Sequence, residues 1–379
     1  MLDFYDSLIT NYNPLGVLFI FILWCIMLVL SKPIVTYRTP ISNDNSKNTI
    51  FIFLLFALVC ILGLHRWDTY HIENTFIGNY DHLEPVHIWI RVNLAYQREL
   101  IYRFIVWGSC VTIYYWLAKK LNCCNRNFCL ACVLFLVESM FPEMRGTSGH
   151  VLLLLGVILL IKSQWHVLDI VLGVICVISA LFFHRSIFIC YFFAIVALLP
   201  FDRKNIVIVS WVLFPIFISL INKYFHFILS SLQSFDYGDL NIVDAVNLYG
   251  ESDFSFGKYN LLGLMTKGII QSPLYLTFFY LTYKIVFKKS KVEWLYRYFF
   301  RWYYICFYIG CLFSYIQTSD WLSVRIKVMA LFPLPFIITK IWDQEKTSTV
   351  WTKTIIVMAI LGNALALLMR YNNWSLGKF

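Results

Sequence analysis

The sequence predicts an all-α polytopic membrane protein with about twelve transmembrane helices. Of its 379 residues, 60% are hydrophobic and only 14% are charged, whereas a soluble domain averages roughly 45–50% apolar and about 25% charged residues. The mean hydropathy is +0.70, and apolar runs recur along the whole chain. Because a single soluble core stops growing at about 250–300 residues, this composition excludes a soluble enzyme, a nucleic-acid-binding domain and a disordered chain.

The individual spans follow from bilayer thickness, since a hydrocarbon core of about 30 Å requires about 17–25 mostly apolar residues per helix. Flanking Trp, Tyr and Arg side chains can extend the shorter runs by snorkelling. The adjacent runs 150–161 and 165–183 are also compatible with a re-entrant pair, so the expected count is ten to twelve within one integral membrane domain, 1–379. The runs are 14–31, 50–64, 101–118, 128–141, 150–161, 165–183, 186–200, 205–222, 261–287, 298–316, 326–341 and 354–370.

The basic residues predict the orientation of these spans. The net charge is +10, and 18 of the 31 Lys and Arg residues lie in the loops that follow the odd-numbered spans, together with only five acidic residues. Cytoplasmic loops of membrane proteins carry such an excess of Lys and Arg. We therefore expect these loops to be cytoplasmic and both termini to face outward. The charge then reflects topology, and no nucleic-acid partner is expected.

The eleven cysteines agree with this orientation, because none lies in the two long outer loops, 65–99 and 223–260. Proteins that face an oxidising compartment avoid unpaired thiols there. One run has a loose metal-ligand pattern, but no second pair follows at zinc spacing, and we expect no metal site. The run is Cys123, Cys124, Cys129 and Cys132.

The first long outer loop is predicted to contain a helix lying on the membrane surface, because apolar residues between 83 and 101 recur at nearly helical spacing. The polar face of this helix would offer Glu84, His87, Arg91 and Arg98. These side chains form either a solvated face with snorkelling arginines or part of a functional site. A functional role is favoured for Glu84 and for Asp68, because each lies near the end of a span.

The second long outer loop combines carboxylates with aromatic residues, which suits a sugar and is also typical of an ordinary acidic loop. Carboxylates accept hydrogen bonds from hydroxyl groups, and aromatic rings stack on the apolar faces of sugars. The residues concerned are Asp236, Asp239, Asp244, Glu251 and Asp253 with Tyr237, Tyr249, Phe254 and Phe256. No inner loop carries a Gly-rich phosphate cradle, so we expect no nucleotide cofactor.

Cations at the predicted outer ends of spans indicate a phosphate-binding site, and this signal is more specific than the composition of the two outer loops. Arg145 precedes span five, His184 and Arg185 lie between spans six and seven, and Arg325 and Lys327 open span eleven. Arginine at membrane depth is costly and is usually paired or functional. Several arginines near one leaflet can bind a pyrophosphate bidentately, and the alternative for each is interfacial anchoring.

Three passages resemble the EpsG-type, Wzy-like polysaccharide polymerases. Asp68-Thr69, with Tyr70, Phe76 and the later Glu84-Pro85, resembles the family's first outer-loop pattern. Phe183-His184-Arg185-Ser186 is similar to its Phe-His-x-Ser motif, and Arg325-Ile326 resembles its Arg-Ile pattern. Arg145 occupies the place of a family arginine, although Gly146 follows it where the family often has Gln. The resemblance extends over residues 60–340.

The resemblance implies a GT-C-like polymerase at the outer, periplasmic face of the bacterial inner membrane. Such an enzyme joins oligosaccharide repeat units carried on undecaprenyl pyrophosphate, for an O-antigen, capsule or exopolysaccharide. The sugar–pyrophosphate bond supplies the energy, so no cofactor is implied. Its partners would be the lipid-linked donor and acceptor, membrane lipids and a chain-length regulator.

We assign hypothetical roles to residues within this chemistry. The base that takes the acceptor hydroxyl proton is His184, Glu84 or Asp68, of which His184 has the intrinsic pKa closest to neutrality. The cations that stabilise the leaving pyrophosphate are Arg145, Arg185 and Arg325, with Arg66 and Arg91 in reserve.

Three other functions compete with the polymerase. An O-antigen ligase uses the same donor but transfers it to lipid A core. A flippase for the lipid-linked oligosaccharide should place polar residues inside its spans, where this chain has few, such as Glu138 and Asp169. A membrane O-acetyltransferase would need a histidine motif on the inner side, which we do not find.

Overall fold

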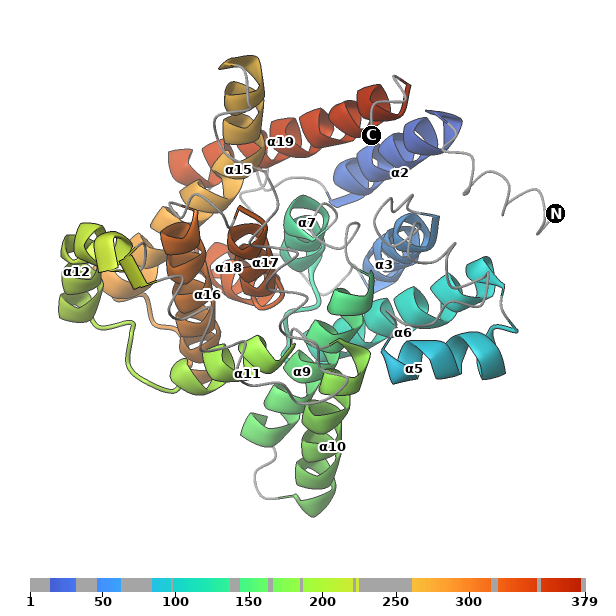
Figure 1. Ribbon diagram of the computed structural model, residues 1–379, viewed down its shortest axis with the longest axis horizontal. Helices are drawn as coiled ribbons and strands as arrows, with labels where there is room; N and C mark the ends of the chain where they lie inside the picture. Colours follow the sequence, from blue (N-terminus) through green and yellow to red (C-terminus); the bar gives the residue numbers. More distant parts are fainter. Residues whose placement is uncertain are drawn as a thin grey trace.

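The structure is a computed structural model, and within the residues it describes every regular element is a helix. The described residues are 14–31, 46–62, 84–96, 98–136, 144–162, 166–184, 187–220, 223–224, 261–314, 320–345 and 349–375. The prediction of an all-α protein is confirmed for these ranges. Figure 1 shows the helices gathered around a central group formed by α7, α16, α17 and α18.

Most described helices coincide with predicted spans to within a few residues. In the first half of the chain the helices are α2 (Pro14–Ser31), α3 (Ser46–Leu62), α5 (Pro85–Trp89), the π-helical turn η2 (Ile90–Leu94), α6 (Glu99–Lys120), α7 (Arg126–Phe135), α9 (Met144–Lys162) and α10 (Val167–Phe183). In the second half they are α11 (Ile187–Val196), α12 (Lys204–Val212), α15 (Leu261–Thr282), the π-helical turn η4 (Tyr283–Phe287), α16 (Trp294–Phe313), α17 (Asp320–Leu331), α18 (Leu334–Gln344) and α19 (Val350–Ser375).

Two predicted spans are interrupted at prolines. The run 326–341 is divided between α17 and α18, because the chain leaves the helix at Phe332 and Pro333 and begins a new one at Leu334. The run 205–222 bends at Leu213, where α12 ends, and is helical again over 214–220. Proline has no backbone N–H and its ring disturbs the preceding turn, and Pro215 lies just beyond this second bend. Hydropathy alone could not reveal either break.

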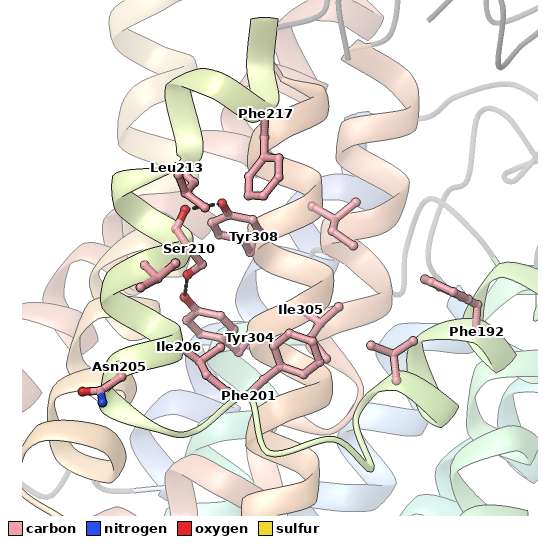
Figure 2. A pocket seen from close by; sticks show the side chains of 13 residues that line it. Phe192, Phe201, Asn205, Ile206, Ser210, Leu213, Phe217, Tyr304, Ile305 and Tyr308 are labelled. Atoms are coloured by element: carbon pink, nitrogen blue, oxygen red, sulfur yellow. Dashed lines mark hydrogen bonds between the residues drawn. The ribbon is translucent and has the colours of Figure 1, made fainter. Parts of the chain in front are cut away.

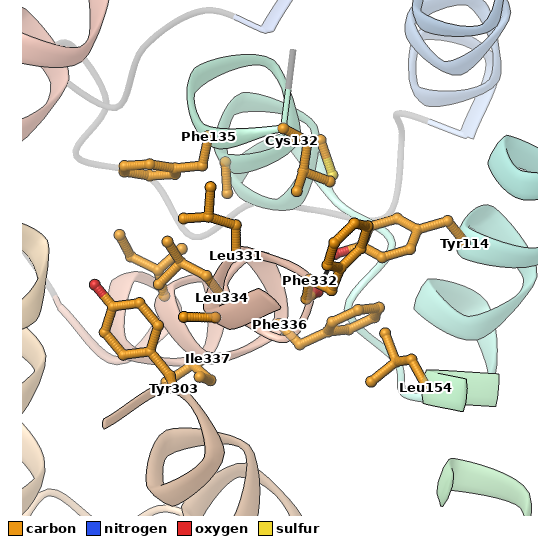
Figure 3. Packing of buried hydrophobic residues seen from close by; sticks show 14 of the residues in the cluster. Tyr114, Cys132, Phe135, Leu154, Tyr303, Leu331, Phe332, Leu334, Phe336 and Ile337 are labelled. Carbon is orange, nitrogen blue, oxygen red and sulfur yellow. Dashed lines mark hydrogen bonds between the residues drawn. The ribbon is translucent and has the colours of Figure 1, made fainter. Parts of the chain in front are cut away.

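The core contains an aromatic cluster that joins four helices, and Figure 3 shows Tyr114 and Phe336 of this cluster among the buried residues around them. The ring of Phe336 on α18 lies 4.9 Å from that of Phe128 on α7, 5.0 Å from Tyr114 on α6 and 6.0 Å from Phe299 on α16, measured between centroids. The Tyr114 hydroxyl donates a hydrogen bond of 2.6 Å to the backbone carbonyl oxygen of Phe332, at the break between α17 and α18. This bond satisfies a carbonyl that the interrupted helix leaves without a helical partner.

Helices α9 and α10 form a closely packed hairpin (Figure 1). Glycines allow the two backbones to approach. A Cβ atom built on Gly156 would lie 2.7 Å from Val177 Cγ2 and 2.8 Å from the carbonyl oxygen of Gly173, and one on Gly149 would lie 2.8 Å from Ile187 Cγ1. These distances are too short for a larger side chain, so the glycines determine how closely the beginning of α11 and the end of α10 approach α9.

Two helical stretches are long and apolar enough to cross a membrane, Leu100–Lys120 and Val350–Leu367. Six shorter stretches of the described chain are also apolar: Leu18–Ser31, Thr49–Ile61, Arg126–Phe135, Gly146–Lys162, Val167–Phe183 and Ile187–Val196. Large apolar side chains face outward along one whole side of α10, at Leu168, Leu172, Ile175, Ile178 and Phe182. Extended exposed apolar faces are typical of surfaces that another apolar phase covers, which supports a membrane protein.

The charged residues at the ends of α6 and α10 show how these helices align. Asp169, near the beginning of the predicted span 165–183, lies in the first turn of α10, where its carboxylate is 3.5 Å from Nζ of Lys120 at the end of α6. At the other end of α10, the carbonyl group of Phe183 is connected through His87 to Tyr102 near the beginning of α6. The helices are therefore antiparallel with matched ends. With 17 residues, α10 is about 26 Å long, close to the hydrocarbon thickness of a bilayer.

Candidate functional site

The helix predicted on the membrane surface turns its polar residues toward the protein. Its polar residues Glu84, His87 and Arg91 are buried against the rest of the protein, whereas Trp89 and Val92 are exposed. The helical stretch of α5 and η2 ends at Leu94, so Ile101 belongs to α6. The alternative of a solvated polar face is therefore wrong for these three residues, and of the predicted apolar face Ile90 is buried and Leu94 is exposed. Arg98 is exposed.

Glu84 and His184, both predicted site residues, are in direct contact. His184 Nδ1 lies 2.8 Å from Glu84 Oε1, and the two side chains are only 13% and 6% exposed. Glu84 is the N-cap residue of α5, held in an extended conformation before Pro85, and His184 is the C-cap residue of α10. The contact joins residues separated by 100 positions in the sequence. We refer to it as the Glu84–His184 pair.

The chemistry of this pair depends on which nitrogen of the His184 imidazole carries the proton. An ionised carboxylate only accepts hydrogen bonds. Nδ1 of His184 is therefore the protonated nitrogen, and it donates a hydrogen bond to Glu84. The structure gives Nε2 no hydrogen bond to any described residue, and the ring retains some exposure. A carboxylate that fixes the tautomer and orientation of a histidine leaves the other nitrogen able to accept a proton from a hydroxyl group.

A second histidine, His87, contacts the residues next to the pair. The fully buried His87 lies three residues after Glu84, and its Nε2 is 3.0 Å from the carbonyl oxygen of Phe183. Its Nδ1 is 2.7 Å from the hydroxyl oxygen of Tyr102, and Ser148 Oγ is 3.5 Å from Nε2. His87 therefore connects the beginnings of α5, α6 and α9 to the end of α10.

Arg91 lies one turn beyond His87, in the π-helical turn η2. It is 2% exposed, and its guanidinium carbon lies 4.6 Å from the centroid of the Tyr102 ring. The backbone N–H of Ala95 donates to the carbonyl oxygen of Ile90, five residues earlier, which defines the wider turn. Such π-helical turns occur frequently at functional sites, and this one directs Arg91 toward the protein interior.

For two of the other predicted cations, Arg145 and Arg325, the structure describes the backbone position. The others lie outside the described residues. Arg145 lies in the first turn of α9, and Ser148 of the same helix approaches His87. Arg185 directly follows His184 in the sequence and, like Arg66 and Asp68, lies outside the described residues. Arg325 lies on α17, which packs against α16. The acidic residues of the second outer loop, between 225 and 260, also lie outside the described part.

Two site residues were missed by sequence reasoning, namely Tyr102 and Ser148. Both lie at the beginning of an apolar helix, where a hydroxyl group has little hydropathic signal. His87 was placed on the polar face of the expected surface helix without a role. Its spacing of three residues from Glu84 put both side chains on one helical face, and this was the signal that could have linked them.

Charged groups at other helix ends form separate clusters. Arg301 Nε donates a 2.8 Å hydrogen bond to Asp202, which also lies 3.4 Å from Arg297. Glu345 accepts a 2.8 Å hydrogen bond from Thr352 and pairs with Lys284. These residues belong to the loops predicted to be cytoplasmic, and all of their partners come from the same predicted side. Each cluster satisfies its own charges and leaves none of these carboxylates for the Glu84–His184 pair.

A further buried cation, Lys327, lies near the junction of α16 and α17. Its Nζ donates hydrogen bonds of 2.7 Å to Ser314 Oγ and 3.1 Å to the Tyr275 hydroxyl. The sequence grouped Lys327 with Arg325 among the cations at the outer ends of spans. The structure holds its ammonium among hydroxyl groups at the end of α16.

The best-defined cavity of the described chain contains none of the predicted site residues. It measures about 490 Å³ and is lined by side chains of α11, α12 and α16. Figure 2 shows Tyr304 and Tyr308 lining it, with their hydroxyl groups turned to Ser210, at 2.8 Å from its Oγ for Tyr304 and 2.5 Å from its carbonyl oxygen for Tyr308. The remaining lining is almost entirely apolar, so this cavity offers no group for acid–base chemistry.

The Glu84–His184 pair, with His87 and Arg91 beside it, is therefore the arrangement among the described residues that best matches the sequence-predicted chemistry. It contains two of the three predicted catalytic residues, and one of the five predicted phosphate-binding arginines, Arg91, lies on the Tyr102 ring whose hydroxyl contacts His87. Comparison with known proteins assigns no family to the chain: no protein-family model, no curated protein and no solved structure matches it.

Proposed function

We propose that this chain is a membrane-embedded glycosyltransferase that joins lipid-pyrophosphate-linked oligosaccharide repeat units into a polysaccharide. The observation that carries the proposal is the 2.8 Å contact between Glu84 and His184. Both residues belong to passages that resemble the Wzy-like polymerases, and they lie far apart in the sequence. Residues of two separate motifs are expected to meet only if those motifs form one site.

In the proposed reaction, His184 acts as the general base. Its Nε2 takes the proton from an acceptor hydroxyl group as the hydroxyl oxygen forms a bond to the anomeric carbon of the donor. The bond from that carbon to the pyrophosphate oxygen breaks, and the lipid pyrophosphate leaves with the electron pair. Glu84 holds the Nδ1–H tautomer and stabilises the imidazolium that forms.

The leaving pyrophosphate needs positive charge, for which we propose Arg145, Arg185 and Arg325. Two of these are linked to the pair by short segments of chain. Arg185 follows His184 directly, and Arg145 begins the helix whose Ser148 approaches His87. Arg91 fits a supporting role better than direct contact with substrate, because its guanidinium is buried on the Tyr102 ring.

The proposed location is the outer face of a bacterial inner membrane, with about twelve spans. The exposed apolar side of α10 and the two helices of membrane-spanning length support a membrane location. The outward orientation is inferred from the distribution of Lys and Arg. The separation of the Glu84–His184 pair from the Lys120–Asp169 pair, at opposite ends of α10, agrees with a site at one membrane face.

Substitution of the two residues tests this proposal. His184→Ala and Glu84→Gln are introduced into the chain in a strain that lacks its own copy, and the surface polysaccharide is analysed by gel electrophoresis. We expect His184→Ala to abolish long chains, because general base catalysis contributes about 10²–10⁴-fold. Glu84→Gln keeps an acceptor for Nδ1 but removes the charge, so we expect a partial loss.

Matched controls come from exposed residues of the same types that also lie at helix ends. His166 is the exposed N-cap residue at the other end of α10, and Glu293 is an exposed N-cap residue of α16. We expect His166→Ala and Glu293→Gln to support full chain length. Single repeat units at the surface of the His184→Ala strain support a polymerase, whereas complete absence of units indicates a ligase or a flippase. Normal chain length with His184→Ala at normal expression would refute the assigned site.

A further inference from the structure

We propose that His87 is a positioning residue that holds His184 in its catalytic orientation, an inference that rests on the proposed function. Glu84 and His87 lie three residues apart in the first turn of α5 and contact two adjacent residues at the end of α10. Glu84 contacts the imidazole of His184, and His87 contacts the carbonyl oxygen of Phe183. We call this pair of contacts the two-point clamp.

The tautomer of His87 follows from its partners. A carbonyl oxygen only accepts hydrogen bonds. Nε2 of His87 is therefore protonated and donates a hydrogen bond to the carbonyl oxygen of Phe183. Full burial favours the neutral imidazole. Nδ1 is then an acceptor, and the Tyr102 hydroxyl donates to it at 2.7 Å. Tyr102 thus selects the tautomer that the clamp requires.

The clamp matters because α10 ends at Phe183. The last carbonyls of a helix lack intrahelical partners, and a histidine side chain can bind one of them. Beyond Phe183 the backbone of His184 becomes extended, with φ −161° and ψ 126°. The bond from His87 fixes the peptide group that immediately precedes this change. Since a displacement of about 1 Å at a reacting group can cost roughly 10²-fold in rate, holding this peptide group controls the reach of His184.

Two isosteric substitutions separate positioning from simple loss of packing. In His87→Gln the amide nitrogen replaces Nε2 and can still donate to Phe183, whereas in His87→Asn the amide reaches only as far as Nδ1. The purified chain is assayed in liposomes with undecaprenyl-pyrophosphate-linked repeat units extracted from a strain that lacks it. We expect His87→Asn to lower kcat at least tenfold with KM within twofold, and His87→Gln to remain within threefold of the unsubstituted chain.

Tyr102→Phe provides a second measurement if His87→Asn does not accumulate. It retains the ring on which Arg91 lies but removes the hydroxyl that selects the tautomer, so we expect a fall in kcat of at least threefold without a change in KM. Equal activity of both His87 variants, or a change confined to KM, would overturn the positioning role. His184→Ala separates the two ideas: if it is inactive while His87→Asn is fully active, only the inference about His87 fails, and if His184→Ala is active, the proposed site fails.

Discussion

Single residues of the candidate site show how the protein keeps charge away from solvent. Arg91 is buried in the π-helical turn with its guanidinium over the Tyr102 ring, and Tyr102 in turn contacts His87. The three side chains therefore form a continuous series of contacts that ends at His87, three residues after Glu84. A substitution at Arg91 should mainly lower the folding stability of the protein, because Arg91 packs on the Tyr102 ring and Tyr102 orients His87.

We expect Arg91→Lys to reduce the free energy of unfolding by about 1–2 kcal/mol, because an ammonium group loses the planar stacking of guanidinium on a buried ring. The measurement is thermal unfolding in detergent, followed by intrinsic fluorescence. Arg98→Lys is the control, since Arg98 is exposed seven residues further along the chain. Equal Tm values for Arg91→Lys and the unsubstituted chain would show that the stacking contributes nothing.

The residues of the site differed in how far sequence could identify them. Glu84 and His184 were predicted because a carboxylate and a histidine lie near span ends in passages that resemble the polymerase family, and the structure places the two in contact. Asp68, Arg66 and Arg185 stay predictions, since they lie outside the described residues. Tyr102, Ser148 and the carbonyl oxygen of Phe183 contribute through contacts between distant segments, and no local pattern encodes which segments meet.

Among the helices, the packing of the α9–α10 hairpin has the largest influence on the position of the site residues. Its glycines bring the backbones close together, and Gly149 lies against Ile187, the first residue of α11. His184 is the C-cap residue at the end of α10. The register of this hairpin therefore determines where His184 stands relative to Glu84.

We expect Gly156→Ala to destabilise the protein by about 1–3 kcal/mol, because the new Cβ atom would overlap Val177 and the backbone of Gly173. Unfolding in detergent measures the effect. Gly108→Ala on α6 is the matched control, since a Cβ atom there meets nothing within 4 Å. That substitution should be neutral or stabilise by up to about 1 kcal/mol. Identical unfolding curves for both variants would contradict glycine-mediated packing.

For the whole molecule, the distribution of charge predicts which face is outside. Asn93, beside the candidate site, and Lys288, in a predicted cytoplasmic loop, are both exposed. We expect Asn93→Cys to react with a membrane-impermeant maleimide in intact cells, and Lys288→Cys to react only after permeabilisation. The difference is measured as labelling above that of the unsubstituted chain.

Native thiols should contribute little background to this measurement. Burial raises the pKa of the Cys123 thiol to about 11 and also raises that of Cys124, so almost no Cys123 thiolate is present at pH 7. If Lys288→Cys reacts in intact cells and Asn93→Cys does not, the orientation is inverted, and the Glu84–His184 pair faces the cytoplasm.

The sequence by itself determined the helical class, most helix positions and two of the residues that meet in the site, because hydropathy, charge and motif spacing are local properties. Only the tertiary structure decided that the polar residues of α5 face inward and that Asp169 pairs with Lys120. Each of these depends on which neighbour satisfies a buried polar group. That choice is made when distant segments pack together, and one segment alone does not contain it.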